Sequence, residues 1–126
     1  MTGRVGLAVV ACVLAAGLAC GGSYANAPSG PPLTSTVIVS FTSFQPLVDT
    51  VKVGGTISWG WLMGSTDHNI LSVGNSFVSF GDSLGTTYDS PTTYAVSFPT
   101  AGSYGYFCSV HGSPTVGMKG RIDVLP

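Results

Sequence analysis

Residues 101–120 of this chain, AGSYGYFCSVHGSPTVGMKG, combine an alternating strand pattern with an unusual set of side chains. Tyr104, Tyr106 and Cys108 fall on one face of a strand predicted from Ser103 to Cys108, because successive side chains of a strand point to opposite faces. A second strand is predicted for residues 119–125, with Ile122 and Val124 in phase. The two strands bracket a tight loop.

Further alternating segments lie upstream of this pair. They begin near Val37, near Leu47, near Ile57, near Ile70 and near Thr93, and each is bounded by Gly, Pro or polar residues. Residues 74–91 are punctuated by Gly and Pro and are expected to be loop, with at most a short strand or a turn of helix. No segment has a helical period. About seven to eight short strands separated by turns predict an all-β, Greek-key β-sandwich.

The composition excludes several classes of protein. Of the 126 residues only 7% are charged, the formal net charge is −1, and no Glu is present. A nucleic-acid partner is not expected, because the chain lacks a basic surface pattern. The 18 Gly, 8 Pro and 44% apolar residues favour a loop-rich β protein over a disordered chain.

The N-terminal segment resembles an export signal. Arg4 precedes an apolar run that is too short to span a bilayer comfortably, and residues 1–19 are predicted to be a signal peptide. The run ends at Cys20, which resembles the lipidated cysteine of bacterial lipoproteins; cleavage at an A-x-A site at residues 25–27 is the alternative. Residues 20–33 are predicted to be a flexible tether, and residues 34–126 the folded domain.

Removal of the signal and lipidation of Cys20 leave Cys108 without a disulfide partner. A lone thiol in an oxidising compartment is either a buried, inert cysteine or a metal ligand. His111 follows it by three positions and Met118 by ten, and His68 lies on a separate loop. Two imidazoles, a thiolate and a thioether suit one copper ion of the blue, type 1 class, whereas a thioether is a poor zinc ligand.

These residues also match a known family. The chain resembles cupredoxins of the plastocyanin type over roughly residues 36–125. The stretches that carry the resemblance are Phe44-x-Pro46, residues 51–54 through Trp59, His68-Asn69-Ile70, and residues 101–111 with 117–120. The segment from Cys108 to Met118 with an upstream His-Asn pair is the most specific of them.

The resemblance implies a role for each of these residues. Cys108 corresponds to the thiolate ligand, His68 and His111 to the two equatorial imidazoles, and Met118 to the weak axial ligand. Asn69 corresponds to a residue that ties the two ligand loops together near the residue after the cysteine, which here is Ser109. Two departures stand out: six residues separate His111 from Met118, more than in plastocyanin, and a carboxylate, Asp67, lies next to His68.

The function that the resemblance implies is transport of single electrons between redox proteins outside the cytoplasm. Storage or delivery of copper without redox turnover is the alternative. The chain is not expected to be an enzyme, because copper oxidases and nitrite reductases need further His-bound copper and both histidines are already used. We expect a monomer in the periplasm or, as a lipoprotein, on the cell surface. It would meet its partners through a weak, transient and uncharged interface near His111.

Overall fold

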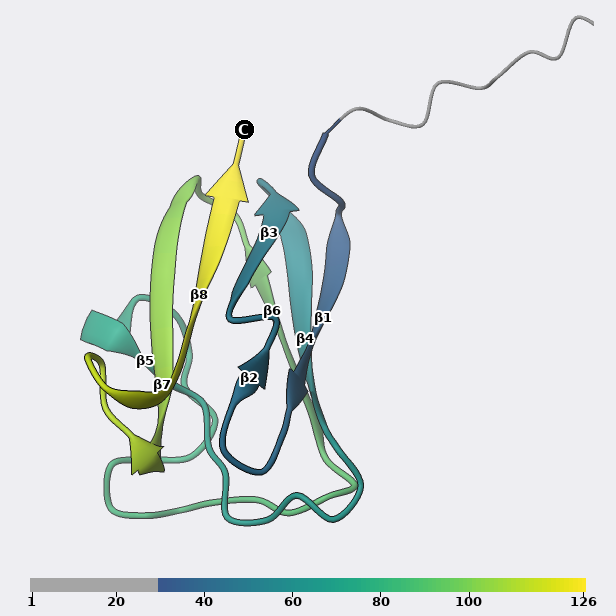
Figure 1. Ribbon diagram of the computed structural model, residues 1–126. Helices are drawn as coiled ribbons and strands as arrows, with labels where there is room; N and C mark the ends of the chain where they lie inside the picture. Colours follow the sequence, from purple (N-terminus) through teal and green to yellow (C-terminus); the bar gives the residue numbers. More distant parts are fainter. Residues whose placement is uncertain (1–29) are drawn as a thin grey trace, which may run out of the picture.

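The computed structural model describes residues 30–126, and the predicted signal peptide, Cys20 and most of the predicted tether lie outside them. Two four-stranded sheets form a sandwich (Figure 1). The first sheet has the order β2 (Phe44–Gln45), β1 (Thr34–Val39), β4 (Gly55–Trp61), β6 (Thr93–Phe98). The second has the order β3 (Val48–Lys52), β8 (Gly117–Leu125), β7 (Gly102–Gly112), β5 (Leu71–Ser72). The predicted all-β, Greek-key sandwich of seven to eight strands is confirmed.

The core lies between the two sheets and follows the predicted alternation. In β4, Ile57 and Trp59 are fully buried and Trp61 is nearly so, while the residues between them are partly exposed. Tyr106 and Cys108 of β7 face Trp59 from the opposite sheet, and the rings of Trp59 and Tyr106 meet edge to face at 5.2 Å. Each such side chain contributes roughly 1.5–3 kcal/mol through removal of its apolar surface from water.

The two ends of the sandwich differ. At one end, here called the terminal end, the chain enters and leaves the fold: Pro32 O accepts a hydrogen bond from Lys52 N, and Leu125 O accepts one from Val53 N. At the other end, here called the distal end, β1 and β4 finish and β8 begins, so the loops that connect them gather there (Figure 1). Candidate ligands on these loops are therefore brought to one end of the molecule.

Some details differ from the sequence prediction. Phe41 and Val53 continue the apolar alternation of Val37 and Val51 in the sequence, but they are 55% and 41% exposed, because β1 ends at Val39 and β3 at Lys52. Strand β2 was not anticipated, since two residues carry no periodic pattern. The short 3-10 turn η1 (Val73–Asn75) at the start of the next segment agrees with the turn of helix that the prediction allowed.

The segment 74–91 is irregular, as expected, yet it contributes to the core. Phe80 stacks against Tyr88 and Tyr94 with ring centroids 3.9 and 4.6 Å apart. These aromatic contacts attach the loop to the first sheet. No helix within residues 30–126 has the length and apolar character required to cross a membrane.

Candidate metal centre

Three of the four predicted ligands come together at the distal end. Cys108 is fully buried in the distal half of β7, and His111 follows on the same strand; both lie within the irregularity of the β7–β8 register between Phe107 and Gly112. The Cys108 Sγ lies 3.5 Å from His111 Nδ1 and 3.7 Å from His68 Nδ1. The ligand atoms of the three residues all lie within 4.8 Å of one another.

These separations fit a common metal ion. Metal–nitrogen bonds of about 2.0 Å and metal–sulfur bonds of about 2.3 Å, as at zinc, separate the two ligand atoms by about 3.7 Å when they meet at about 120°. The measured values of 3.5 and 3.7 Å agree with this trigonal spacing. Two imidazole nitrogens and a thiolate with a thioether nearby form a donor set that suits copper.

Met118 is the fourth predicted ligand and lies next to this cluster. It is the second residue of β8, is 1% exposed and belongs to the hydrophobic core. Its backbone runs so close to Gly112 that a Cβ on Gly112 would collide with the Met118 nitrogen. The thioether side chain is thus held in an apolar environment beside β7, the strand that carries Cys108 and His111.

The extra length between His111 and Met118 is taken up by a turn. Gly112 pairs with Gly117, which continues the β7–β8 ladder beyond the register shift. The residues between them, 113–116, form a turn in which Ser113 N donates to Val116 O at 2.8 Å and Ser113 Oγ accepts from Val116 N at 3.3 Å. Gly117 has φ +74°, a conformation that favours glycine. The longer loop therefore leaves His111 and Met118 close together.

His68 reaches the centre from the connection between β4 and β5. It follows β4 and forms an isolated antiparallel bridge with Tyr88, with hydrogen bonds of 3.2 Å from His68 N to Tyr88 O and 2.8 Å from Tyr88 N to His68 O. Trp61 Nε1 also donates to Tyr88 O at 2.9 Å. The His68 side chain is fully buried, and this burial, followed by the nearby His111, lowers its pKa below the ordinary value. A neutral imidazole is the form that binds a metal.

Asn69 links the two halves of the centre, as predicted. Its Oδ1 accepts a 2.9 Å hydrogen bond from Ser109 N, and its Nδ2 donates to Ser109 Oγ at 2.9 Å. The same Nδ2 donates to Thr86 O at 3.1 Å and to Asp82 O at 3.3 Å. A fully buried amide thus joins the residue after His68 to the residue after Cys108, which fixes the relative position of the two candidate ligands.

Asp67, the second departure from the family pattern, is exposed. Its backbone adopts φ +60°, and its amide donates to Asp89 Oδ1 at 2.9 Å. Its carbonyl oxygen, not its carboxylate, approaches the centre, at 3.9 Å from Cys108 Sγ. The carboxylate still raises the pKa of His68, although this influence is smaller than that of burial.

The loop beneath Asn69 is supported by Asp82, which was not predicted from the sequence to have a role at the site. The Asp82 carboxylate accepts hydrogen bonds from Leu84 N at 2.9 Å, Thr86 N at 3.0 Å and Thr86 Oγ1 at 2.7 Å. These bonds to Thr86 lower the pKa of Asp82. The signal was present as an aspartate followed closely by Ser and Gly, a pattern typical of turns closed by the Asp side chain.

The comparisons with known proteins agree with this geometry. Residues 39–125 match the model of a family described as copper binding proteins of the plastocyanin/azurin type. A plastocyanin from Scenedesmus fuscus is 34% identical over 86 residues, which are 64% of this chain and 85% of that protein. A chloroplastic plastocyanin from Tetradesmus obliquus is 34% identical over 89 residues, which cover 57% of its length.

Solved structures show the same fold. The crystal structure of amicyanin from Paracoccus versutus matches with a TM-score of 0.54 and 26% identity, over 79% of this chain and 86% of that one. A mutant plastocyanin of fern matches with a TM-score of 0.57 over 71% of this chain and 99% of that one. At 20% identity this second likeness concerns the fold alone. The chain belongs to the plastocyanin/azurin family of copper-binding proteins, the cupredoxins, and its buried cluster of histidine, cysteine and methionine fits a type 1 copper site.

Proposed function

We propose that this protein carries single electrons between redox partners outside the cytoplasm. The observation that carries the proposal is the cluster of His68, Cys108 and His111, with ligand atoms within 4.8 Å of one another beside a buried thioether. Copper held there would supply exchange of one electron between Cu(I) and Cu(II). The proposal assigns the metal to His68 Nδ1, Cys108 Sγ and His111 Nδ1, with Met118 as the weak axial ligand.

The residues around the cluster favour fast electron exchange because they restrict movement of the ligands. Cys108, His111 and Met118 belong to one hairpin, and the hydrogen bonds of Asn69 connect that hairpin to His68. Cys108, His68 and Met118 are each at most 1% exposed, so water has little access to them. A site that is held in place by its surroundings has little to rearrange when its charge changes by one.

The same features speak against storage or delivery of copper. Release of the ion requires ligands that can open to solvent or to a receiving protein, and three of the four proposed ligands are buried. The described residues hold one such ligand set. Catalysis is not part of the proposal, since both histidines of the chain are assigned to this single ion.

Spectroscopy and voltammetry test the proposal together. The copper(II)-loaded protein should absorb intensely in the visible range, lose that band on addition of one electron equivalent, and regain it on oxidation. A competing chelator should remove copper slowly from both redox states. A colourless protein, or one that gives up its copper in each reduction cycle, would favour storage or delivery instead.

We further propose that partners dock at the distal end, around His111. Five apolar side chains at that end are 43–89% exposed: Phe41, Leu62, Met63 and Val116 from loops and turns, and Val110 from the end of β7. His111 is the less buried of the two histidines, so its ring offers a route for electrons to the surface. A small, largely apolar contact suits a short-lived encounter between a monomeric carrier and its partner.

Export and attachment to the membrane complete the proposal, and both concern residues outside the described range. Residues 1–19 would be removed and Cys20 lipidated, which would give a periplasmic or cell-surface lipoprotein. Cell fractionation tests this proposal. A Cys20→Ser variant should appear in the soluble fraction, and a variant that stayed with the membrane would show that another segment is the anchor.

A further inference from the structure

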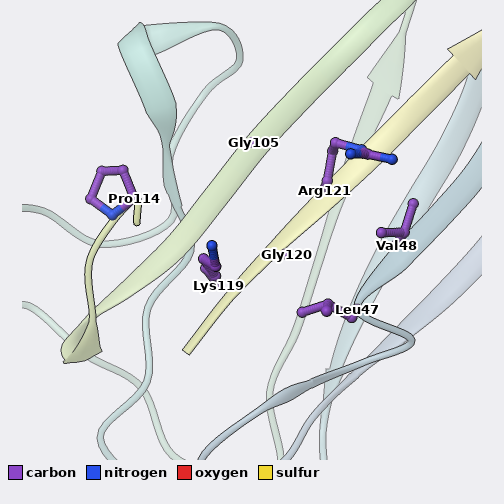
Figure 2. A pocket seen from close by; sticks show the side chains of 7 residues that line it. All are labelled: Leu47, Val48, Gly105, Pro114, Lys119, Gly120 and Arg121. Atoms are coloured by element: carbon purple, nitrogen blue, oxygen red, sulfur yellow. The ribbon is translucent and has the colours of Figure 1, made fainter. Parts of the chain in front are cut away.

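The outer face of the second sheet carries a shallow depression of about 270 Å³. Figure 2 shows Lys119 and Arg121 projecting from β8, with Pro114 on one side and Leu47 and Val48 on the other. Because Met118 and Ile122 face the core, the alternation of a strand places Lys119 and Arg121 on the outside. Gly105, opposite Arg121 in the β7–β8 ladder, has no side chain to fill the space. We call this site the β8 depression.

The charges of the β8 depression do not cancel. Arg121 forms an ion pair with Asp123 at 2.9 Å, and Ser103 Oγ also donates to that carboxylate at 2.7 Å. These two bonds lower the pKa of Asp123, which therefore stays ionised. Lys119 has no carboxylate within ion-pair distance among residues 30–126. The depression thus keeps one uncompensated positive charge, although the described part of the chain has five acids and only three bases.

We propose that the β8 depression receives a carboxylate side chain of the redox partner. This inference rests on the proposed function, and it names a chemical feature of the partner: an acidic group beside the surface that contacts His111. Pro114 lines the depression and belongs to the turn that starts two residues after His111, so the depression is continuous with the proposed docking surface.

The chemistry of the depression suits a protein carboxylate. Its apolar walls at Leu47 and Val48 displace water, which strengthens the attraction between Lys119 and an anion. Its volume accommodates one or two side chains. A nucleic acid would need several phosphate contacts, and a chain with more acids than bases would repel its backbone.

The test is a titration followed by NMR. A short peptide of consecutive glutamates is added at low salt to the ¹⁵N-labelled, copper(I)-loaded protein, and a glutamine peptide of equal length is the neutral control. We expect the glutamate peptide to shift the amide signals of Gly105, Lys119 and Arg121, and the glutamine peptide to leave them in place. The Lys119→Gln variant should bind the glutamate peptide about three- to fivefold more weakly, as expected for loss of one exposed ion pair.

A matched variant separates local binding from net charge. Lys52→Gln makes the same charge change in β3 near the terminal end, and it should leave the affinity unchanged. Equal weakening by both variants, or equal binding of the two peptides, would overturn the proposal. If the same amide signals move when the protein alone is concentrated, a second copy of this chain occupies the depression. That result would also overturn the proposal.

Two further measurements keep the result interpretable. Lys119 follows the proposed ligand Met118, so the visible spectrum and reduction potential of Lys119→Gln are measured first. They should match the wild type, because the Lys119 side chain projects outward from the sheet (Figure 2); if they change, Arg121→Gln replaces this variant. Loss of colour or of reversible electron exchange in the wild type would contradict the proposed function. Peptide binding that does not depend on Lys119 or Arg121 would contradict only the present inference.

Discussion

Two regions of the molecule meet at the metal centre and are held in different ways. The ligand hairpin, residues 102–125, carries Cys108, His111 and Met118 on two strands joined by a backbone ladder. The histidine arm, residues 62–92, carries only His68, and apart from the short β5 and η1 it has no regular structure. It is fixed by isolated bridges, by aromatic stacking and by side-chain hydrogen bonds.

This difference shows that the centre depends on two kinds of interaction. A backbone ladder is repeated along the hairpin, so the change of one side chain leaves most of it intact. The arm depends on a few particular groups, chiefly the Asn69 amide and the Asp82 carboxylate, so a single substitution can loosen it. Substitutions in the hairpin should therefore alter the metal chemistry, and substitutions in the arm should alter the position of His68.

The largest effect is expected from Cys108→Ser in the hairpin. This change removes the soft thiolate, so the visible band and most of the copper affinity should be lost. Absorption spectroscopy and a competition assay with a chelator measure both quantities. The fold should persist, because the β7–β8 ladder pairs residues 102–107 with 119–124 and does not include the sulfur, and circular dichroism checks this point. A serine variant that stayed blue would refute the assignment of Cys108.

Asn69→Ala should have the next largest effect, because it separates the arm from the hairpin. It leaves Ser109 N without its acceptor in a mostly buried place, and we expect the free energy of unfolding to fall by about 2–4 kcal/mol. Copper affinity should fall by roughly ten- to a hundredfold, as for other residues that orient ligands. Urea unfolding and metal competition measure the two losses.

The control for this prediction is Gln45→Ala. Gln45 is an exposed amide whose side chain makes one hydrogen bond, of 3.3 Å to Ser43 Oγ. Its removal should change stability by less than about 0.5 kcal/mol. Similar losses in the two variants would show that the arm does not depend on Asn69 in particular.

Asp82→Asn should have a smaller effect that depends on pH. The hydrogen bonds from Thr86 hold the pKa of Asp82 below its unfolded value, so its stabilising contribution is complete above about pH 4 and is lost as the pH falls through the folded pKa. The variant should be less stable than the wild type at neutral pH, and the difference should narrow in acid. Denaturant unfolding at several pH values tests this.

The matched control for Asp82 is Asp123→Asn in the hairpin. Hydrogen bonds from Ser103 and Arg121 also lower the pKa of Asp123, but this residue lies far along β8 from the arm. Both variants should lose acid-dependent stability, and only Asp82→Asn should weaken copper binding. Equal copper affinity in the two variants would argue against a role for Asp82 in placing His68.

The smallest effect on copper binding is expected from Met118→Leu. Leucine has nearly the same volume and fits a buried apolar position, so the fold should lose less than about 1.5 kcal/mol. The colour should remain and the reduction potential should shift, because a weak axial thioether tunes the metal without holding it. Voltammetry measures the reduction potential, and absorption spectra show whether the colour remains. Outright loss of copper would show that the Met118 sulfur is a strong ligand.

The hairpin and most strands could be predicted because their information is local. The alternation in β4 and β7 follows directly from the pleat of a strand, and the spacing of Cys108, His111 and Met118 lies within one loop. Phe41 continues the alternation of β1 yet lies beyond its end, because alternation does not reveal where a strand stops. Strand β2 exists only because Val39 and Ile38 pair with Phe44 and Gln45.

The histidine arm could not be predicted beyond His68 and Asn69, since its structure depends on distant contacts. Phe80 packs against the core through Trp61, nineteen positions earlier in the chain, and Tyr94, fourteen positions later. The hydrogen bond from Asp67 N to Asp89 similarly joins positions that no periodic pattern connects. The family resemblance supplied the Asn69 link to Ser109, which the residues alone did not indicate.

Both ends of the described chain lie at the terminal end of the sandwich. There Pro32 O accepts a hydrogen bond from Lys52 N of β3, and Leu125 O accepts one from Val53 N. Strand β8 has nine residues and spans most of the distance to the centre, so about 30 Å of protein separates either end from His111. A molecule immobilised on an electrode by either end would therefore face His111 toward the solution and exchange electrons poorly with the metal surface. Fast electron exchange with an electrode requires attachment through the turn at residues 113–116 instead.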